Sequence, residues 1–160
     1  MNHLVAAAFA ASLAFAASPT LAQDAPSKPR EPAFDAALAE KTGADARGMR
    51  SYVLVILKTG PTRVPDGEAR KAMFAGHMAN IQRLSKAGQL VLAGPFSGDE
   101  SGWRGLFVFA VDDIEQAKAL TATDPVIVNG EMVAEYHTWY GSAATMLITE
   151  LHDTLVRETP

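Results

Sequence analysis

The order of apolar segments along the chain is the feature that most restricts its fold. Four segments carry the continuous or alternating apolar residues that are typical of strands, and two carry apolar residues at helical spacing. In chain order they read strand, helix, strand, strand, helix, strand, over residues 49–57, 66–87, 89–96, 104–111, 113–121 and 131–139. This order predicts an α+β fold of the ferredoxin-like βαββαβ type, an antiparallel four-stranded sheet with both helices on one face.

The two predicted helices differ in how clearly the sequence defines them. In the first, residues 66–87, one arc of the helical wheel holds the apolar residues Met73, Phe74, Ile81 and Leu84. His77 lies inside this arc, and Met78 is expected to pack in the core. In the second, Asp112 with Glu115 three residues later predicts the N-cap, and Asp124-Pro125 lies just beyond the end.

Two more helices are predicted outside the sheet-forming segments. Residues 33–41 are expected to form a short helix that ends before Gly43, and residues 143–157 place Leu147, Leu151 and Leu155 at steps of four. The second pattern gives an amphipathic helix that must dock on something. The face of the sheet without helices also needs a cover, so we expect either a homodimer or added elements there.

The N-terminal residues predict export. Residues 4–17 form an uncharged apolar run that is shorter than the roughly 20 residues of a membrane span. Small side chains at Thr20 and Ala22 suit a cleavage site after Ala22, while an uncleaved anchor or a wrongly chosen start codon is the alternative. We expect a signal peptide (1–22), a Pro-rich linker with the short helix (23–45), the folded domain (46–142) and a C-terminal extension (143–160). The mature protein is expected in the periplasm or medium, without stable membrane insertion.

Composition excludes several kinds of chemistry. The chain of 160 residues has no cysteine, so it has no disulfide, thiolate nucleophile or thiolate metal site. Its formal net charge is −4 and it shows no basic patch, which argues against nucleic acid as a partner. There is no Gly-rich phosphate loop, nucleophile elbow or dinucleotide fingerprint, so no cofactor is expected. The function classes that remain are a soluble acid/base enzyme and a small-molecule binder.

Four short motifs occur in order along the chain: GHMANI at 76–81, LVLAGPF at 90–96, ATDP at 122–125 and EYHTWYG at 135–141. Together they resemble the YciI-like (YCII-related) domain family, from about Tyr52 to Gly141. The resemblance implies a dimeric α+β barrel. It also implies an active-site dyad of the helix histidine and the aspartate of the Asp-Pro pair, which match His77 and Asp124. The family includes a cofactor-free dehydrochlorinase of chlorinated aromatic breakdown, and most members have no assigned reaction.

His77 and Asp124 have the chemistry of a general-base pair. A histidine on an apolar helix face favours the neutral imidazole, which can accept a proton. A carboxylate bonded to one ring nitrogen fixes the tautomer and stabilises the imidazolium that forms when the other nitrogen takes a proton. The alternative is a buried histidine bonded to a backbone carbonyl, with Asp124 making an Asx turn into Pro125.

Other residues are candidates for substrate binding. Alternation along the last strand puts Glu135, His137 and Trp139 on one face, where Trp139 can stack on an aromatic ligand and Glu135 can bind an amine. The alternative is an edge strand whose polar face is solvated or lies in a dimer contact. Phe74 near His77 and Ser97 after the second strand are further candidates. The alternative for Ser97 is that it follows the end of the strand and has no role in ligand binding.

A metal site built from His77, His137, Asp124 and Glu135 has suitable ligand types for zinc or iron, but the sequence has no close histidine pair, so no metal is expected. We therefore expect a pocket near His77 and Asp124 that binds a small organic molecule. As an enzyme, the protein would be a cofactor-free lyase or isomerase. The alternative is a non-catalytic periplasmic ligand-binding or protein-interaction module that uses its terminal helix.

Overall fold

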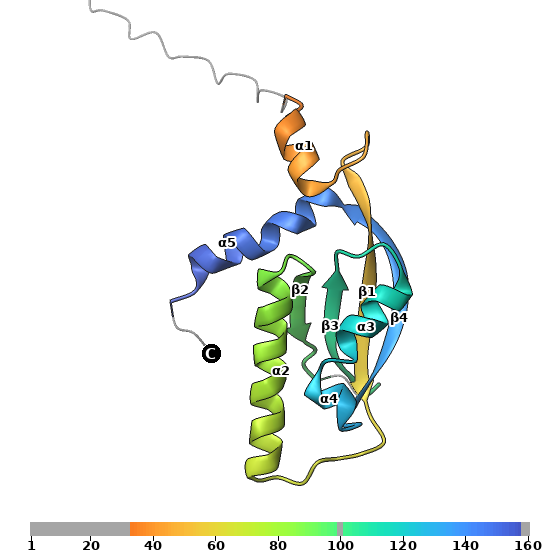
Figure 1. Ribbon diagram of the computed structural model, residues 1–160, viewed down its shortest axis with the longest axis vertical. Helices are drawn as coiled ribbons and strands as arrows, with labels where there is room; N and C mark the ends of the chain where they lie inside the picture. Colours follow the sequence, from red (N-terminus) through yellow and green to blue (C-terminus); the bar gives the residue numbers. More distant parts are fainter. Residues whose placement is uncertain (1–32, 99–100, 158–160) are drawn as a thin grey trace, which may run out of the picture. The chain divides into compact units, whose positions relative to one another are not determined.

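The computed structural model describes residues 33–98 and 101–157 (Figure 1). The predicted signal peptide (1–22) and residues 23–32 of the predicted linker lie outside these residues. The described residues from Asp35 onward form one compact unit. Within the described ranges, no helix has the length and apolar character needed to cross a bilayer.

The elements confirm the predicted order and add a short helix before the last strand. They are α1 (Ala36–Thr42), β1 (Met49–Thr59), α2 (Glu68–Lys86), β2 (Leu90–Pro95), β3 (Trp103–Phe109), α3 (Ile114–Thr121), α4 (Pro125–Val128), β4 (Met132–Ser142), the 3₁₀ helix η1 (Ala143–Leu147) and α5 (Ile148–Leu155).

The sheet has the strand order β2-β3-β1-β4, and every neighbouring pair is antiparallel. This is the ferredoxin-like arrangement, so the predicted fold class is confirmed. β1 lies inside the sheet and pairs with β4 from Met49–Ser142 to Thr59–Met132. β4, which carries the candidate residues Glu135, His137 and Trp139, is an edge strand. Dimerisation stays a prediction.

The main core fills the space between the sheet and the helices α2, α3 and α4. Its buried residues come from both layers and include Val53, Val55, Leu57, Met73, Leu84, Phe107, Phe109, Ala117 and Val126. Phe74 and Ile81 pack against this core, as the apolar arc of α2 predicts. Met78 does not, because it lies on the flank of α2 and is exposed.

The opposite face of the sheet is covered only in part. Tyr52, Val91 and Val108 form a small buried cluster there, against which Met146 of η1 packs. The Tyr52 hydroxyl donates to the Ser142 carbonyl at 2.9 Å, which ties this face to the end of β4. The expected cover is thus supplied at one end by the C-terminal segment of the same chain.

Some helix ends differ from the prediction. α2 begins two residues later, after Gly67, whose φ of 147° is not helical. The N-cap of α3 is Asp113, not Asp112, because the Asp113 carboxylate is the one that accepts from the Gln116 N–H, at 2.8 Å.

The C-terminal helix also differs, since its first residues form η1 and α5 starts at Ile148. Its apolar stripe does not dock as expected: Leu151 is 62% exposed and Leu155 is 77% exposed. Instead, Glu150 of α5 pairs with Lys41 of α1 at 2.6 Å, so the two added helices meet each other.

Candidate functional site

His77 and Asp124 meet in the structure. The His77 Nδ1 atom lies 2.9 Å from Oδ1 and 2.8 Å from Oδ2 of Asp124. The Asp124 side chain is fully buried, and 12% of the His77 side chain is exposed. The pair therefore joins the middle of α2 to the start of α4, 47 residues apart in the chain.

The local sequence explains why Asp124 takes this position. It is the N-cap of α4, with extended backbone, and its Oδ1 accepts the Val126 N–H at 3.1 Å. Pro125 occupies the first helical position, where its missing N–H costs nothing. The Asx turn that was the alternative interpretation of Asp124 is present, and the same carboxylate also contacts His77.

A glycine on α2 allows the two helices to approach. A Cβ atom at Gly76 would lie only 3.0 Å from Cγ of Pro125. The absence of a side chain at Gly76 therefore brings α4 close enough for the aspartate before Pro125 to reach the histidine after Gly76.

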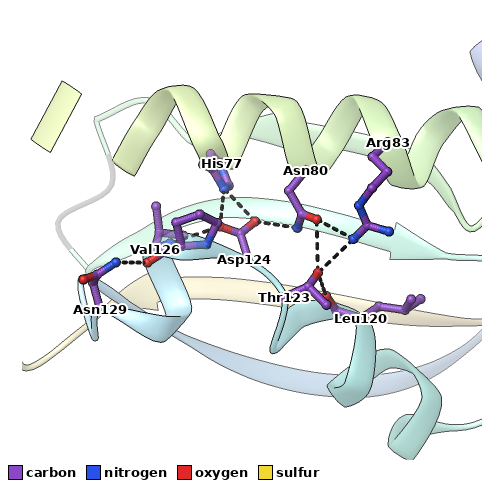
Figure 2. Close-up of polar contacts among 9 residues, drawn as sticks. His77, Asn80, Arg83, Leu120, Thr123, Asp124, Val126 and Asn129 are labelled. Carbon is purple, nitrogen blue, oxygen red and sulfur yellow. Dashed lines mark hydrogen bonds and ion pairs between the residues drawn. The ribbon is translucent and has the colours of Figure 1, made fainter. Parts of the chain in front are cut away.

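Figure 2 shows that the Asp124 carboxylate is also held from α2, one turn beyond His77. The Asn80 side-chain N–H donates to Asp124 Oδ2 at 3.2 Å. The Asn80 carbonyl oxygen accepts from Arg83 at 2.7 Å and from the Thr123 hydroxyl at 3.1 Å. Arg83 also donates to the Thr123 hydroxyl oxygen, at 3.0 Å. These contacts fix which way the Asn80 amide points, with its nitrogen toward the carboxylate.

This network assigns the histidine tautomer. The Asp124 carboxylate only accepts hydrogen bonds, so the contact at Nδ1 requires a proton on that nitrogen. In the neutral ring Nε2 then carries the lone pair. No hydrogen bond from Nε2 to another described residue is found, and no buried side-chain nitrogen or oxygen in this part of the chain lacks a partner. Nε2 is therefore the atom that reaches solvent.

Aromatic rings flank the histidine. The His77 ring stacks on Phe107 of β3 with centroids 6.0 Å apart, and it meets Phe74 of α2 in a T-shaped contact at 6.3 Å. Phe74, a candidate substrate-binding residue, therefore lies beside His77, and its role in binding stays a prediction. These rings exclude water from the sides of the imidazole and strengthen its polar contact with Asp124.

The second set of candidates lies elsewhere. Glu135, His137 and Trp139 share one face of β4 as predicted, opposite Ile56, Leu54 and Tyr52 of β1. The Trp139 ring lies against that of Tyr52 in a tilted contact, with ring centroids 5.3 Å apart, on the face of the sheet away from α2. These three residues therefore do not share a site with His77 within one chain.

On that face Glu135 is the centre of an exposed polar group. It accepts from His137 Nε2 at 2.8 Å and from Lys58 at 3.2 Å. The hydrogen bond from His137, followed by that from Lys58, lowers the pKa of Glu135 below its ordinary value.

Ser97 is exposed beyond the end of β2. Over the described ranges no three His, Asp or Glu side chains gather in a way that would hold a metal ion.

A groove of about 840 Å³ lies on the other flank of α2, between α2, β2, η1 and α5. Met78, Ile81, Val91 and Met146 give it an apolar lining, and Lys86 and His152 are polar residues in it. Neither His77 nor Asp124 lines this groove. A pocket beside the dyad stays a prediction.

Sequence reasoning missed Asn80, Arg83 and Thr123. A weak signal was present, since Asn80 is one turn after His77 and Thr123 precedes Asp124. Their roles depend on the packing of α2 against the α3–α4 turn, which a pattern along the chain does not reveal.

Comparison with known proteins gives the following relations. No match was found among curated proteins. Among solved structures, the chain is similar to the 5-chloro-2-hydroxyhydroquinone dehydrochlorinase from Burkholderia phenoliruptrix AC1100, solved in complex with 2,5-dihydroxybenzoquinone. The identity is 17%, the match covers 55% of this chain and 92% of that chain, and the TM-score is 0.41. The YCII-related domain matches residues 51–139, which span β1 to β4 and include both His77 and Asp124. The chain therefore belongs to the YCII-related domain family.

Proposed function

We propose that the protein binds a small organic molecule beside His77 and catalyses a cofactor-free proton transfer on it, as a lyase or isomerase. The observation that carries this proposal is the contact of His77 Nδ1 with the buried Asp124 carboxylate at 2.8 Å, which leaves Nε2 as an accessible base.

In the proposed reaction Nε2 takes a proton from a carbon of the ligand. The electron pair of that C–H bond then forms a double bond. In an elimination a leaving group departs with its bonding electron pair. In an isomerisation an existing double bond of the ligand breaks, and its electron pair takes the proton back from the imidazolium at another carbon. The positive charge that develops on His77 is stabilised by Asp124, which is the role of the carboxylate in such pairs.

Asn80 is a positioning residue in this proposal. It acts on the reaction through Asp124, because its amide N–H donates to the carboxylate while its oxygen is held by Arg83 and Thr123. With the Val126 N–H on the other oxygen, the carboxylate is held in one orientation. Such preorganisation keeps the imidazole in the tautomer that the reaction needs.

Export to the periplasm or the medium is also a proposal. It is supported by the apolar run at residues 4–17 and the small residues before the expected cleavage site. A substrate met in that compartment would come from outside the cytoplasm. N-terminal sequencing of the protein recovered from a periplasmic fraction would test this, because the proposal requires the chain to start at Gln23.

The experiment that tests the binding site is a thermal-shift screen against small aromatic acids, phenols, lactones and amines. A specific ligand at 100 times its Kd adds about 2.7 kcal/mol of stability. The screen is run on the wild type, His77→Ala and His152→Ala. The second variant is the matched control, because His152 lines the groove on the other flank of α2.

A shift that disappears in His77→Ala and persists in His152→Ala supports binding at the dyad and defines the compounds to assay for turnover. A shift that persists in His77→Ala contradicts binding at this site.

A non-catalytic binding module is the second candidate function. The observation that favours it is the groove of about 840 Å³, a volume typical of ligand sites, which α5 helps to build outside the family-matched residues. If this candidate is correct, the thermal shift is lost in His152→Ala and retained in His77→Ala.

A further inference from the structure

We propose that the ligand at His77 carries a carboxylate and that Arg104 binds it. This inference rests on the proposed function, since it names the chemical class of the small molecule that His77 receives. It comes from a group of three arginines around one buried glutamate, at the end of the sheet where α2 begins.

Glu131, the residue before β4, is the centre of this group. Its buried carboxylate accepts the Val64 N–H at 2.8 Å and contacts Arg70 at 2.8 Å. The backbone N–H of Val64 and then Arg70 lower the pKa of Glu131, so it is negatively charged at neutral pH. Arg104 and Arg63 lie farther away, at 3.9 and 4.0 Å. Three positive charges therefore surround one buried negative charge.

Two of these arginines already have hydrogen-bond partners. Arg70 donates to the Val64 carbonyl at 2.9 Å as well as contacting Glu131. Arg63 donates to Asp66, at 3.3 Å. For the Arg104 guanidinium no hydrogen bond to another residue in the described ranges is found, and 30% of its side chain is exposed. Its N–H groups are therefore available to a ligand, and a guanidinium matches a carboxylate with two parallel hydrogen bonds.

A β-bulge places Arg104 in this group. Leu57 of β1 pairs with Gly105 and the next residue, Lys58, pairs with Trp103, so Arg104 is the extra residue of β3. A bulge leaves its extra residue without a partner on the facing strand, here β1, and changes the direction of the side chain. The Arg104 guanidinium consequently lies near the same Glu131 oxygen that Arg70 of α2 contacts.

Aromatic contacts connect this group to the dyad. The Arg70 guanidinium lies 4.9 Å from the centre of the Phe74 ring, and Phe74 contacts the His77 ring. On the sheet, Phe107 stacks on His77 and is three residues after Arg104 on β3. A carboxylate bound at Arg104 would thus place the apolar part of a ligand along these rings, with a carbon near Nε2.

The test is an NMR titration that follows the His77 ring resonances. The probes are benzoate and hexanoate, with benzyl alcohol and benzylamine as neutral and cationic analogues of the aromatic acid. The proteins are the wild type, Arg104→Gln, Arg104→Lys and Arg47→Gln. Arg47 is an exposed arginine in the loop before β1, so its variant controls for the loss of one positive charge.

We expect a carboxylate to shift the His77 resonances in a saturable way, and Arg104→Gln to raise its Kd at least about tenfold. Arg47→Gln should leave the Kd unchanged, and Arg104→Lys should fall between them. The inference is overturned if Arg104→Gln binds the carboxylates like the wild type, if benzyl alcohol binds as tightly as benzoate, or if neither carboxylate shifts His77.

None of these three outcomes contradicts the role of His77 as the base. That role is tested separately, by measuring in the ligand-free protein which ring nitrogen of His77 carries the proton. Conversely, His77 could carry its proton on Nε2 while carboxylates still bind through Arg104. That result would contradict the role of His77 as the base and would leave Arg104 as a binding residue.

Discussion

The carboxylate of Asp124 holds His77 and caps α4 at the same time. Oδ1 accepts the Val126 N–H at 3.1 Å, while both carboxylate oxygens lie within 2.9 Å of His77 Nδ1. One buried side chain therefore determines both a helix start and the orientation of the proposed base. This dual role has consequences for stability as well as for chemistry.

Replacement of Asp124 by alanine should be costly. It leaves the Val126 N–H, the Asn80 amide and His77 Nδ1 without their common acceptor, and we expect a loss of about 2–4 kcal/mol in the free energy of unfolding. Urea denaturation measures this. Asp113→Ala is the matched control, because Asp113 caps α3 at the surface and its loss should cost only about 1 kcal/mol. Equal losses in the two variants would contradict the buried role of Asp124.

A larger side chain at Gly76 should separate α2 from α4. Its Cβ would lie 3.0 Å from the Pro125 ring, so Gly76→Val should force a shift and cost about 1–3 kcal/mol. Ala79→Val, at an exposed position of the same helix, introduces a valine without the contact. By helix propensity alone Ala79→Val is destabilising, whereas a valine in place of glycine is slightly favourable. If Gly76→Val unfolds at the same urea concentration as the wild type or at a higher one, the close approach at Gly76 does not matter.

The stability of the protein should fall in acid partly through Glu131. Its pKa is lowered in the folded protein by the Val64 N–H and by Arg70. The unfolded chain, with the ordinary value near 4.5, takes up the proton more readily, so the stabilisation is complete above that pH and decreases as the pH falls below it.

Urea midpoints measured between about pH 3 and 7 test this. Glu131→Gln should show a weaker decline in acid than the wild type, whereas Glu40→Gln, at an exposed position on α1, should decline like the wild type. A parallel decline of Glu131→Gln and the wild type would be the opposite result.

The partly covered face of the sheet predicts a homodimer. We expect light scattering at micromolar concentration to give twice the mass of the chain. Val133 lies on this face beside Glu135, so Val133→Asp should weaken the dimer. Val128→Asp, an exposed position on α4 at the helix side, should not. A monomeric wild type would show that the C-terminal segment alone is sufficient cover.

Much of the fold follows from local pattern. The apolar runs of β1 and β3 and the arc of α2 that holds Met73 and Leu84 form the observed core. The exposed stripe of α5 shows where pattern is insufficient, because Leu151 and Leu155 have helical spacing and yet are mostly exposed in the described part of the chain. Spacing defines a possible apolar face but not the surface that meets it.

The candidate site was predictable only in part. The family motifs pointed to His77 and Asp124, and the structure brings them together. The alternation of residues along β4 correctly put Glu135 and His137 on one face. It did not predict whether the helices cover that face, because this depends on how the helices pack on the sheet. Asn80 and Arg104 could not be found in this way, since one depends on helix packing and the other on a shift in strand register.

The most direct test of the proposed base is the tautomer of His77, read from long-range ¹H–¹⁵N correlations of the imidazole in the ligand-free protein at about pH 8. The account predicts a proton on Nδ1 and none on Nε2 in the wild type. In Asp124→Asn this pattern should be lost or reversed, because an amide N–H facing Nδ1 turns that nitrogen into an acceptor. A wild-type His77 that carries its proton on Nε2, or one whose tautomer is the same in Asp124→Asn, would contradict the account.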